Sequence, residues 1–227
     1  MNRPKKTIAP AKAIARAIHD EIEALPTRDA PSVDRIRRRY SALLAPEPPE
    51  FVREVARELL SQRHRWFPCA ILRYHRAAFA GLGAEDLEEL GQGMASWGAV
   101  DAFARTLAGP AWLAGRVPDG LIHRWARSPN RWWRRAALVS TVALNVRSHG
   151  GKGDARRTLR VCAMLAADRD DMVVKALSWA LRELVVHDRD AIAAFLAEHE
   201  GVLAARVKRE VRHKIETGVK NPRRRSR

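Results

Sequence analysis

"DDMVVKALSWALREL", residues 170–184, has the spacing of apolar residues that gives a helix one buried face. An α-helix turns by about 100° per residue, so side chains three and four positions apart lie on the same face. The apolar residues of this segment follow that spacing and form one stripe, which consists of Val173, Ala176, Leu177, Ala180, Leu181 and Leu184. An aspartate at position 170 or 171 can cap the first turn. We therefore predict an amphipathic helix over 170–187.

Helices of this kind come in pairs from Pro118 onward, a short one followed by a long one. The predicted pairs are 118–127 with 129–147, 153–167 with 170–187, and 188–199 with 202–217. Pairs that repeat at about 30–40 residues are typical of HEAT-like solenoids, even where the repeats share little sequence. Upstream, Pro and Gly divide the chain into further helical segments at 9–25, 31–45, 49–62, 65–80, 84–94, 96–108 and 110–115. We predict an all-α protein, a curved HEAT-like solenoid with a basic concave face.

The breaks between the predicted helices are short. PEPP at 46–49 and GGKG at 150–153 are the clearest of them, and neither is long enough to be a domain linker. Ser128 before Pro129 has the pattern of an N-cap with proline in the first turn. We predict a single domain over 1–220, followed by a disordered basic tail, NPRRRSR, at 221–227.

The charge balance of the chain indicates a polyanionic partner. The sequence has 42 Lys and Arg against 26 Asp and Glu, a formal net charge of +16. These basic residues are spread over many helices, and no segment combines a basic face with a broad aromatic-rich apolar face. Nucleic acid is therefore the expected partner rather than a membrane surface, although a generally Arg-rich proteome also raises the charge.

Cysteine usage and the N-terminus suggest a protein of the cytoplasm. Cys69 and Cys162 lie far apart, and neither belongs to a CxxC pair or a His-rich stretch, so the spacing predicts neither a disulfide framework nor a zinc site. The first residues lack a continuous apolar region, and no apolar run approaches the length of a membrane span. We expect a cytoplasmic, nucleoid-associated monomer without a metal, a cofactor or an obligatory protein partner.

"WGAVDAF", residues 97–103, carries an acidic residue away from its apolar stripe. Trp97 and Asp101 are one helical turn apart, so the indole and the carboxylate stack on the edge that faces away from the core. Two structural explanations remain open at this point. Asp101 can pair with Arg105, which also lies four residues away, and Trp97 can pack against the next helix.

Two further side chains depart from the apolar patterns. Arg135 lies within the apolar stripe of 129–147, and a buried guanidinium is costly unless it is paired. Its partner is either an internal carboxylate or a phosphate in a groove. Trp179 projects among charged residues on the far side of 170–187, where it can pack against a neighbouring repeat or form an aromatic wall for a cationic or sugar-like ligand.

Three segments together resemble a known family. WGAVD at 97–101, SPNRWWRRAAL at 128–138 and VVKALSWALRE at 173–183 are similar to the signature segments of the AlkD-type DNA alkylation repair glycosylases, in the same order. The resemblance implies a HEAT-like solenoid that holds double-stranded DNA in its concave face and hydrolyses the N-glycosidic bond of alkylated purines. It further implies that Asp101 is catalytic, that Trp97 and Trp179 flank the lesion, and that Arg135 contacts a phosphate.

The resemblance has departures, and other functions are open. Where the family often has a second tryptophan and an acidic residue around the first tryptophan, this chain has Ser96 and Gly98, and "PSVDRIRRRY" at 31–40 matches only loosely. One alternative is a non-catalytic DNA-binding solenoid that recognises bent or branched duplexes. Another is a protein scaffold whose basic face binds an acidic partner. An anion at position 101 favours the glycosylase, because a pure phosphate binder gains nothing from it.

Overall fold

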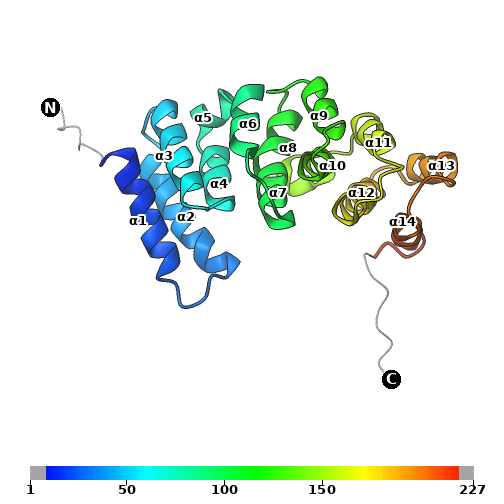
Figure 1. Cartoon of the computed structure of the whole chain (residues 1–227), viewed down its shortest axis with the longest axis horizontal. Helices are drawn as coiled ribbons and strands as arrows, with labels where there is room; N and C mark the ends of the chain where they lie inside the picture. The colour runs from blue at the N-terminus through cyan, green and yellow to red at the C-terminus, as the bar shows by residue number, and fades with distance from the viewer. Residues whose placement is uncertain (1–8, 220–227) are drawn as a thin grey trace. The chain divides into compact units, whose positions relative to one another are not determined.

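The computed structural model describes residues 9–219, and every regular element in this range is helical (Figure 1). The prediction of an all-α protein is thereby confirmed. The described chain forms two compact units, one that ends at Leu82 and one that begins at Gly83. The prediction of a single domain over 1–220 stays a prediction, and the predicted basic tail at 221–227 lies outside the described residues.

The described residues of the first unit, 9–82, form five helices. They are α1 (Ala11–Glu23), α2 (Ala30–Leu44), α3 (Pro49–Ser61), α4 (Trp66–Tyr74) and α5 (Arg76–Ala80). Helix α3 packs against α1 and α4, and α2 packs against α4. Their apolar faces form a common core, whose largest fully buried side chains are Ile18, Leu44, Leu59, Phe67, Ile71 and Leu72. Burial of this apolar surface is the main source of stability for the unit.

The single helix predicted over 65–80 is wrong, because the structure divides it into α4 and α5 at His75. The backbone of His75 is extended, with φ −91° and ψ 104°. Its Nδ1 accepts a hydrogen bond of 3.0 Å from the backbone N–H of Ala78, so the side chain caps α5. Its Nε2 lies 3.1 Å from the carbonyl oxygen of Glu47. Two fixed contacts of one imidazole therefore hold the chain out of helical geometry at this residue.

The second unit contains the repeated helix pairs. It begins with α6 (Ala84–Gly91), α7 (Trp97–Phe103), a π-helical turn η1 (Ala104–Ala108) and α8 (Gly109–Leu113). The pairs follow: α9 (Asp119–Ala126) with α10 (Arg131–Asn145), α11 (Ala155–Met164) with α12 (Asp171–Leu184), and α13 (Arg189–Glu198) with α14 (Ala205–Thr217); a short 3₁₀ turn, η2 (Arg147–His149), follows α10. The alternation of short and long helices agrees with the sequence prediction.

The long helices of the pairs pack side by side in one row. Helix α12 lies between α10 and α14 and contacts both, and each long helix also contacts the short helix of its own pair (Figure 1). Helix α12 begins where the sequence predicted, because the Asp170 carboxylate accepts hydrogen bonds from the N–H groups of Met172 and Val173. Helix α10 begins later than predicted. Asn130, not Ser128, is its N-cap and accepts a hydrogen bond of 2.8 Å from the N–H of Trp132.

A break predicted between 108 and 110 is also wrong, because helical geometry continues from α7 through η1 into α8. The N–H of Gly109 donates to the carbonyl oxygen of Ala104, five residues earlier, which is the pattern of a π turn. Pro110 follows without an N–H group of its own. A side chain at position 109 would clash, since a Cβ there would lie 2.6 Å from the carbonyl oxygen of Ser140. Glycine therefore allows η1 and α8 to approach α10 closely.

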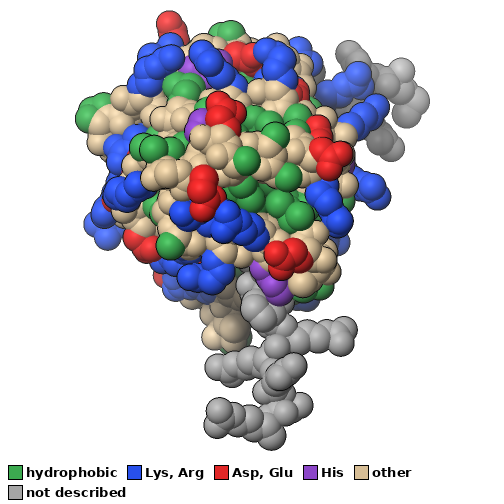
Figure 2. Space-filling model, turned by 90° about the vertical axis from the view of Figure 1, so that its right-hand side faces the viewer, with side chains coloured by type: hydrophobic (Ala, Val, Ile, Leu, Met, Phe, Trp, Pro, Cys, Tyr) green, Lys and Arg blue, Asp and Glu red, His purple; other side chains and the backbone are tan. Residues whose placement is uncertain are grey.

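Basic and acidic side chains alternate on the end of the second unit formed by α13 and α14 (Figure 2). Arg206 pairs with Glu210 at 2.8 Å, and Lys208 and Arg212 both pair with Glu200. Three basic side chains of α14 therefore have acidic partners nearby. The predicted basic concave face stays a prediction. Within residues 9–219, no helix has both the length and the apolar character that crossing a membrane requires.

Candidate active site

Asp101 on α7 and Arg135 on α10 form a bidentate ion pair. The guanidinium donates from Nε to Oδ1 and from Nη2 to Oδ2, each at 3.0 Å. The Arg135 side chain is only 6% exposed and that of Asp101 is 21% exposed. The sequence left two partners open for Arg135, an internal carboxylate or a phosphate in a groove. In the structure, the partner is the internal carboxylate of Asp101. The ion-pair partner of Asp101 is thus Arg135 and not Arg105, four residues along its own helix.

Arg135 also contacts α12. Its Nη1 donates a hydrogen bond of 2.7 Å to the carbonyl oxygen of Met172, in the first turn of that helix. Each of the three guanidinium nitrogens therefore has a protein acceptor, which is what a nearly buried arginine requires. The side chain consequently joins α7, α10 and α12 and holds the Asp101 carboxylate in one position relative to the long helices.

Opposing effects act on the pKa of Asp101. Burial raises the pKa of this carboxyl group above its usual range, and the charges of Arg135 and then Arg105 lower it by a smaller amount. The net direction is upward, so burial dominates. The positively charged guanidinium of Arg135, at hydrogen-bond distance, favours the ionised form of this carboxyl group. A fixed, partly buried anion of this kind interacts strongly with positive charge placed beside it.

Trp97 begins α7 one turn before Asp101 and is 62% exposed. The alternative in which this indole packs against the next helix is therefore wrong. The helix start is fixed by Ser96, whose hydroxyl accepts a hydrogen bond of 3.2 Å from the N–H of Ala99. A Cβ added at Gly98 would meet nothing within 4 Å, so the surface beside the indole is open. Trp97 thus exposes an aromatic face one helical turn from Asp101.

Trp179 lies on α12, about two helical turns beyond Met172. Its indole Nε1 donates a hydrogen bond of 2.8 Å to Glu183, which fixes the ring on the helix surface. The side chain is half-buried and lines a small hollow together with Arg182, Glu183, Val186 and Lys214. Arg182, Glu183 and Lys214 give this hollow both positive and negative charge.

The sequence did not single out the aromatic contacts that support α7. Phe103, Trp125 and Trp133 form a cluster in which the two indole rings have centroids 4.9 Å apart. Trp133 also lies against Gly91, where an added Cβ would be 2.3 Å from the ring. The cluster packs the end of α7 against α9 and α10 and so supports the geometry of the ion pair. The three aromatic residues belong to three different helices, so their mutual contact is a tertiary feature that the local sequence pattern does not show.

A comparison with protein families gives one match. The family model described as "DNA alkylation repair enzyme" matches residues 9–215, and its range contains Trp97, Asp101, Arg135 and Trp179. The comparison with curated proteins found no match.

Proposed function

Since the chain belongs to the DNA alkylation repair enzyme family, we propose that it is a monofunctional DNA glycosylase that excises cationic alkylated purines from duplex DNA. The proposed substrates are guanine alkylated at N7 and adenine alkylated at N3. The observation that carries this proposal is the ion pair of Asp101 and Arg135, which holds a carboxylate one turn from an exposed tryptophan in a chain of net charge +16.

The chemistry requires only one carboxylate. An alkylated purine of this kind already carries a positive charge, so it leaves as a neutral base and needs no general acid. When the bond between C1′ and the base breaks, the bonding electrons leave with the base and an oxocarbenium ion forms on the deoxyribose. A fixed anion beside that sugar stabilises the transition state more than the ground state. Water then bonds to C1′, and its proton passes to Asp101 or to solvent.

Arg135 is proposed to position Asp101. Its two hydrogen bonds fix both carboxylate oxygens, so the anion does not need to reorganise as positive charge develops on the sugar. A guanidinium has five N–H groups, and those that do not contact Asp101 or Met172 remain for a second acceptor. The phosphate contact implied by the family resemblance would use these groups and would keep the DNA backbone close to the carboxylate.

Trp97 and Trp179 are proposed to flank the lesion. An aromatic face attracts a cation by about 0.5–2 kcal/mol, and most strongly where the contact is desolvated. The exposed indole of Trp97 is accessible for such a contact, and Trp179 is held by Glu183, one turn further along the same helix α12. These residues would select a positively charged base over an ordinary neutral one.

The decisive experiment measures the release of free base. Duplex DNA that contains 7-methylguanine is incubated with the full-length protein, and the products are separated by chromatography. We expect free 7-methylguanine and an abasic strand, without strand cleavage by the protein itself. Tight binding to this duplex without any release of base would contradict a glycosylase and would leave the alternative of a non-catalytic DNA-binding protein.

A further inference from the structure

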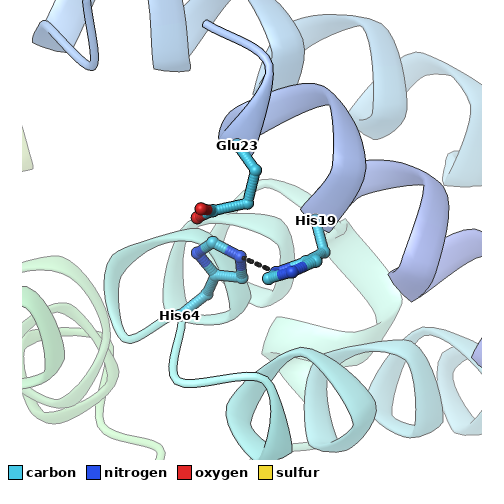
Figure 3. A group of neighbouring side chains, drawn as sticks. All are labelled: His19, Glu23 and His64. Atoms are coloured by element: carbon cyan, nitrogen blue, oxygen red, sulfur yellow. Dashed lines mark hydrogen bonds between the residues drawn. The ribbon is translucent and has the colours of Figure 1, made fainter.

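Outside the Asp101 site, three metal-ligating side chains meet in the first unit: His19 and Glu23 on α1 and His64 after α3 (Figure 3). Their ligand atoms all lie within 4.8 Å of one another. Nδ1 of His19 is 2.9 Å from Nε2 of His64, and the two rings meet edge to face. Both histidines are half-buried and Glu23 is exposed, so the group opens toward solvent on the side of the carboxylate.

The backbone places these three side chains together. His19 and Glu23 are four residues apart on α1, and therefore lie on one face of the helix, a turn apart. His64 follows Arg63, whose φ of 67° lies in the left-handed region that usually favours glycine. The N–H groups of Arg63 and His64 donate to the carbonyl oxygens of Leu60 and Leu59, which terminates α3 in a Schellman motif. This strained turn directs His64 back toward α1.

The protonation states suit a metal ion. A contact of 2.9 Å between two ring nitrogens requires one of them to carry hydrogen and the other to accept it, so at least one is neutral. Neutral imidazole nitrogen is the form that coordinates metals. A metal ion would replace the shared hydrogen, which can move to the other nitrogen of the same ring.

The spacing also suits a metal ion. Two nitrogens bound to one tetrahedral zinc ion at about 2.0–2.1 Å lie roughly 3.3 Å apart. The two histidine nitrogens are already within a few tenths of an ångström of that separation. Glu23 reaches the same group, and its Oε2 is bonded to Arg28 at 2.5 Å, which leaves Oε1 for a metal. Contacts of this kind from outside the ligand set orient a ligating carboxylate.

We propose that His19, Glu23 and His64 bind a divalent transition-metal ion, with zinc as the best fit to two imidazoles and one carboxylate. His19 would coordinate through Nδ1 and His64 through Nε2, and water would occupy the fourth position. The ion would join α1 to the turn between α3 and α4 and so stabilise the first unit. Cysteine spacing predicted no zinc site, but these ligands come from segments 45 positions apart that meet only through the turn at Arg63.

Titration of the full-length protein with zinc chloride alone tests the proposal, after treatment with a chelator and its removal by dialysis. We expect one zinc ion per chain, and a rise in Tm of about 5 °C at a hundredfold excess of free zinc over Kd. His19→Gln and His64→Gln should each weaken zinc binding by at least about tenfold and reduce the rise in Tm to about half or less at the same zinc concentration. The matched control is His213→Gln on α14, which should bind zinc as wild type does.

Two further measurements keep the test decisive. Circular dichroism and Tm without metal show whether each variant folds, and His64→Gln should retain the helical spectrum of wild type. Cobalt(II) bound in place of zinc should give the intense visible absorption of a tetrahedral site in wild type and not in His64→Gln. The proposal is overturned if wild type binds no zinc, or if both histidine variants bind it as tightly as wild type. Neither result depends on base release by the Asp101 site.

Discussion

Arg135 holds both carboxylate oxygens of Asp101 at 3.0 Å, although the two residues are 34 positions apart in sequence. The same guanidinium bonds to the carbonyl oxygen of Met172, so one buried side chain connects three helices. The pair has a structural role, and the proposed chemical role of Asp101 depends on the same geometry. A carboxylate that is fixed in this way is a source of negative potential that does not have to be oriented during a reaction.

Asp101→Asn separates the charge of this site from its shape. Asparagine keeps the size and one acceptor oxygen but removes the negative charge, so we expect excision of 7-methylguanine to fall by roughly 10²–10³-fold. Affinity for duplex DNA should stay the same or rise, because an anion is removed from the neighbourhood of phosphates. Single-turnover excision and duplex affinity are measured on both proteins. If the variant excises as fast as wild type, Asp101 is not the catalytic carboxylate.

Arg135→Ala should weaken both the fold and the activity. It leaves a partly buried carboxylate without its partner, and breaking a buried pair in this way costs about 3–5 kcal/mol, less here because Asp101 is 21% exposed. Tm should therefore drop by several degrees, and excision should fall because Asp101 loses its fixed position. Arg135→Lys is the matched control, since it keeps the charge but not the bidentate geometry. An unchanged Tm for Arg135→Ala would contradict the structural part of this role.

The sequence predicted the elements of the fold more reliably than their connections. Apolar periodicity and capping residues located the long helices of the second unit, because both are local features. The division at His75 depends on the contact of its imidazole with Glu47, 28 positions earlier. The continuity across Pro110 depends on a π turn packed against α10. Neither contact has a signature within the local sequence.

For the candidate site as well, the sequence predicted local features but not the contacts between helices. The pattern marked Asp101, Arg135 and Trp179 as departures from apolar stripes, and it placed Trp97 one turn from Asp101. It did not determine that Asp101 and Arg135 are partners, because periodicity offered only Arg105, on the same helix, as a partner for Asp101. Identifying the pair requires the packing of α7 on α10, which the cluster of Phe103, Trp125 and Trp133 supports. The catalytic and phosphate-binding roles of the site residues remain predictions.

Trp97→Ala tests the exposed aromatic residue. The indole is 62% exposed and buries little surface, so Tm should change by less than about 2 °C. Loss of a desolvated cation–π contact of up to about 2 kcal/mol should lower kcat/KM for 7-methylguanine by up to about thirtyfold. Leu43→Ala, which removes an apolar side chain that is 48% exposed in the first unit, should change neither quantity. Equal excision by wild type and Trp97→Ala would remove the indole from the proposed site.

Affinity for duplex DNA should fall steeply as salt is added. A protein with a net charge of +16 that contacts phosphates through Arg and Lys releases counterions, so the logarithm of the binding constant declines linearly with the logarithm of salt concentration. Between about 50 and 200 mM salt, six or more phosphate contacts would reduce the affinity by at least about 10³-fold. The measurement is fluorescence anisotropy on an unmodified duplex. An affinity that does not vary with salt would contradict binding through phosphates.

The raised pKa of Asp101 predicts an acidic limb in the pH dependence of excision. Only the ionised carboxylate stabilises the oxocarbenium ion, and burial raises the pKa of this group above the 3.8 of an ordinary aspartate. As pH is lowered, the rate of excision should therefore begin to decline at a higher pH than that at which an ordinary aspartate becomes protonated. The contribution of Asp101 to the free energy of unfolding changes with pH in the opposite direction to the rate of excision. Because the folded-state pKa is higher than the unfolded one, ionisation of Asp101 opposes folding, and its contribution to stability decreases as pH rises through the folded-state pKa.

Single-turnover excision of 7-methylguanine from pH 4 upward measures this limb, with spontaneous base loss subtracted from a reaction without protein. Asp101→Asn is the control, because its small residual rate should no longer depend on pH over this range. The limb is assigned to another group if it persists in Asp101→Asn. If wild type instead keeps its full rate down to pH 4, the charge of Arg135 outweighs burial at Asp101 and holds the carboxyl group ionised throughout.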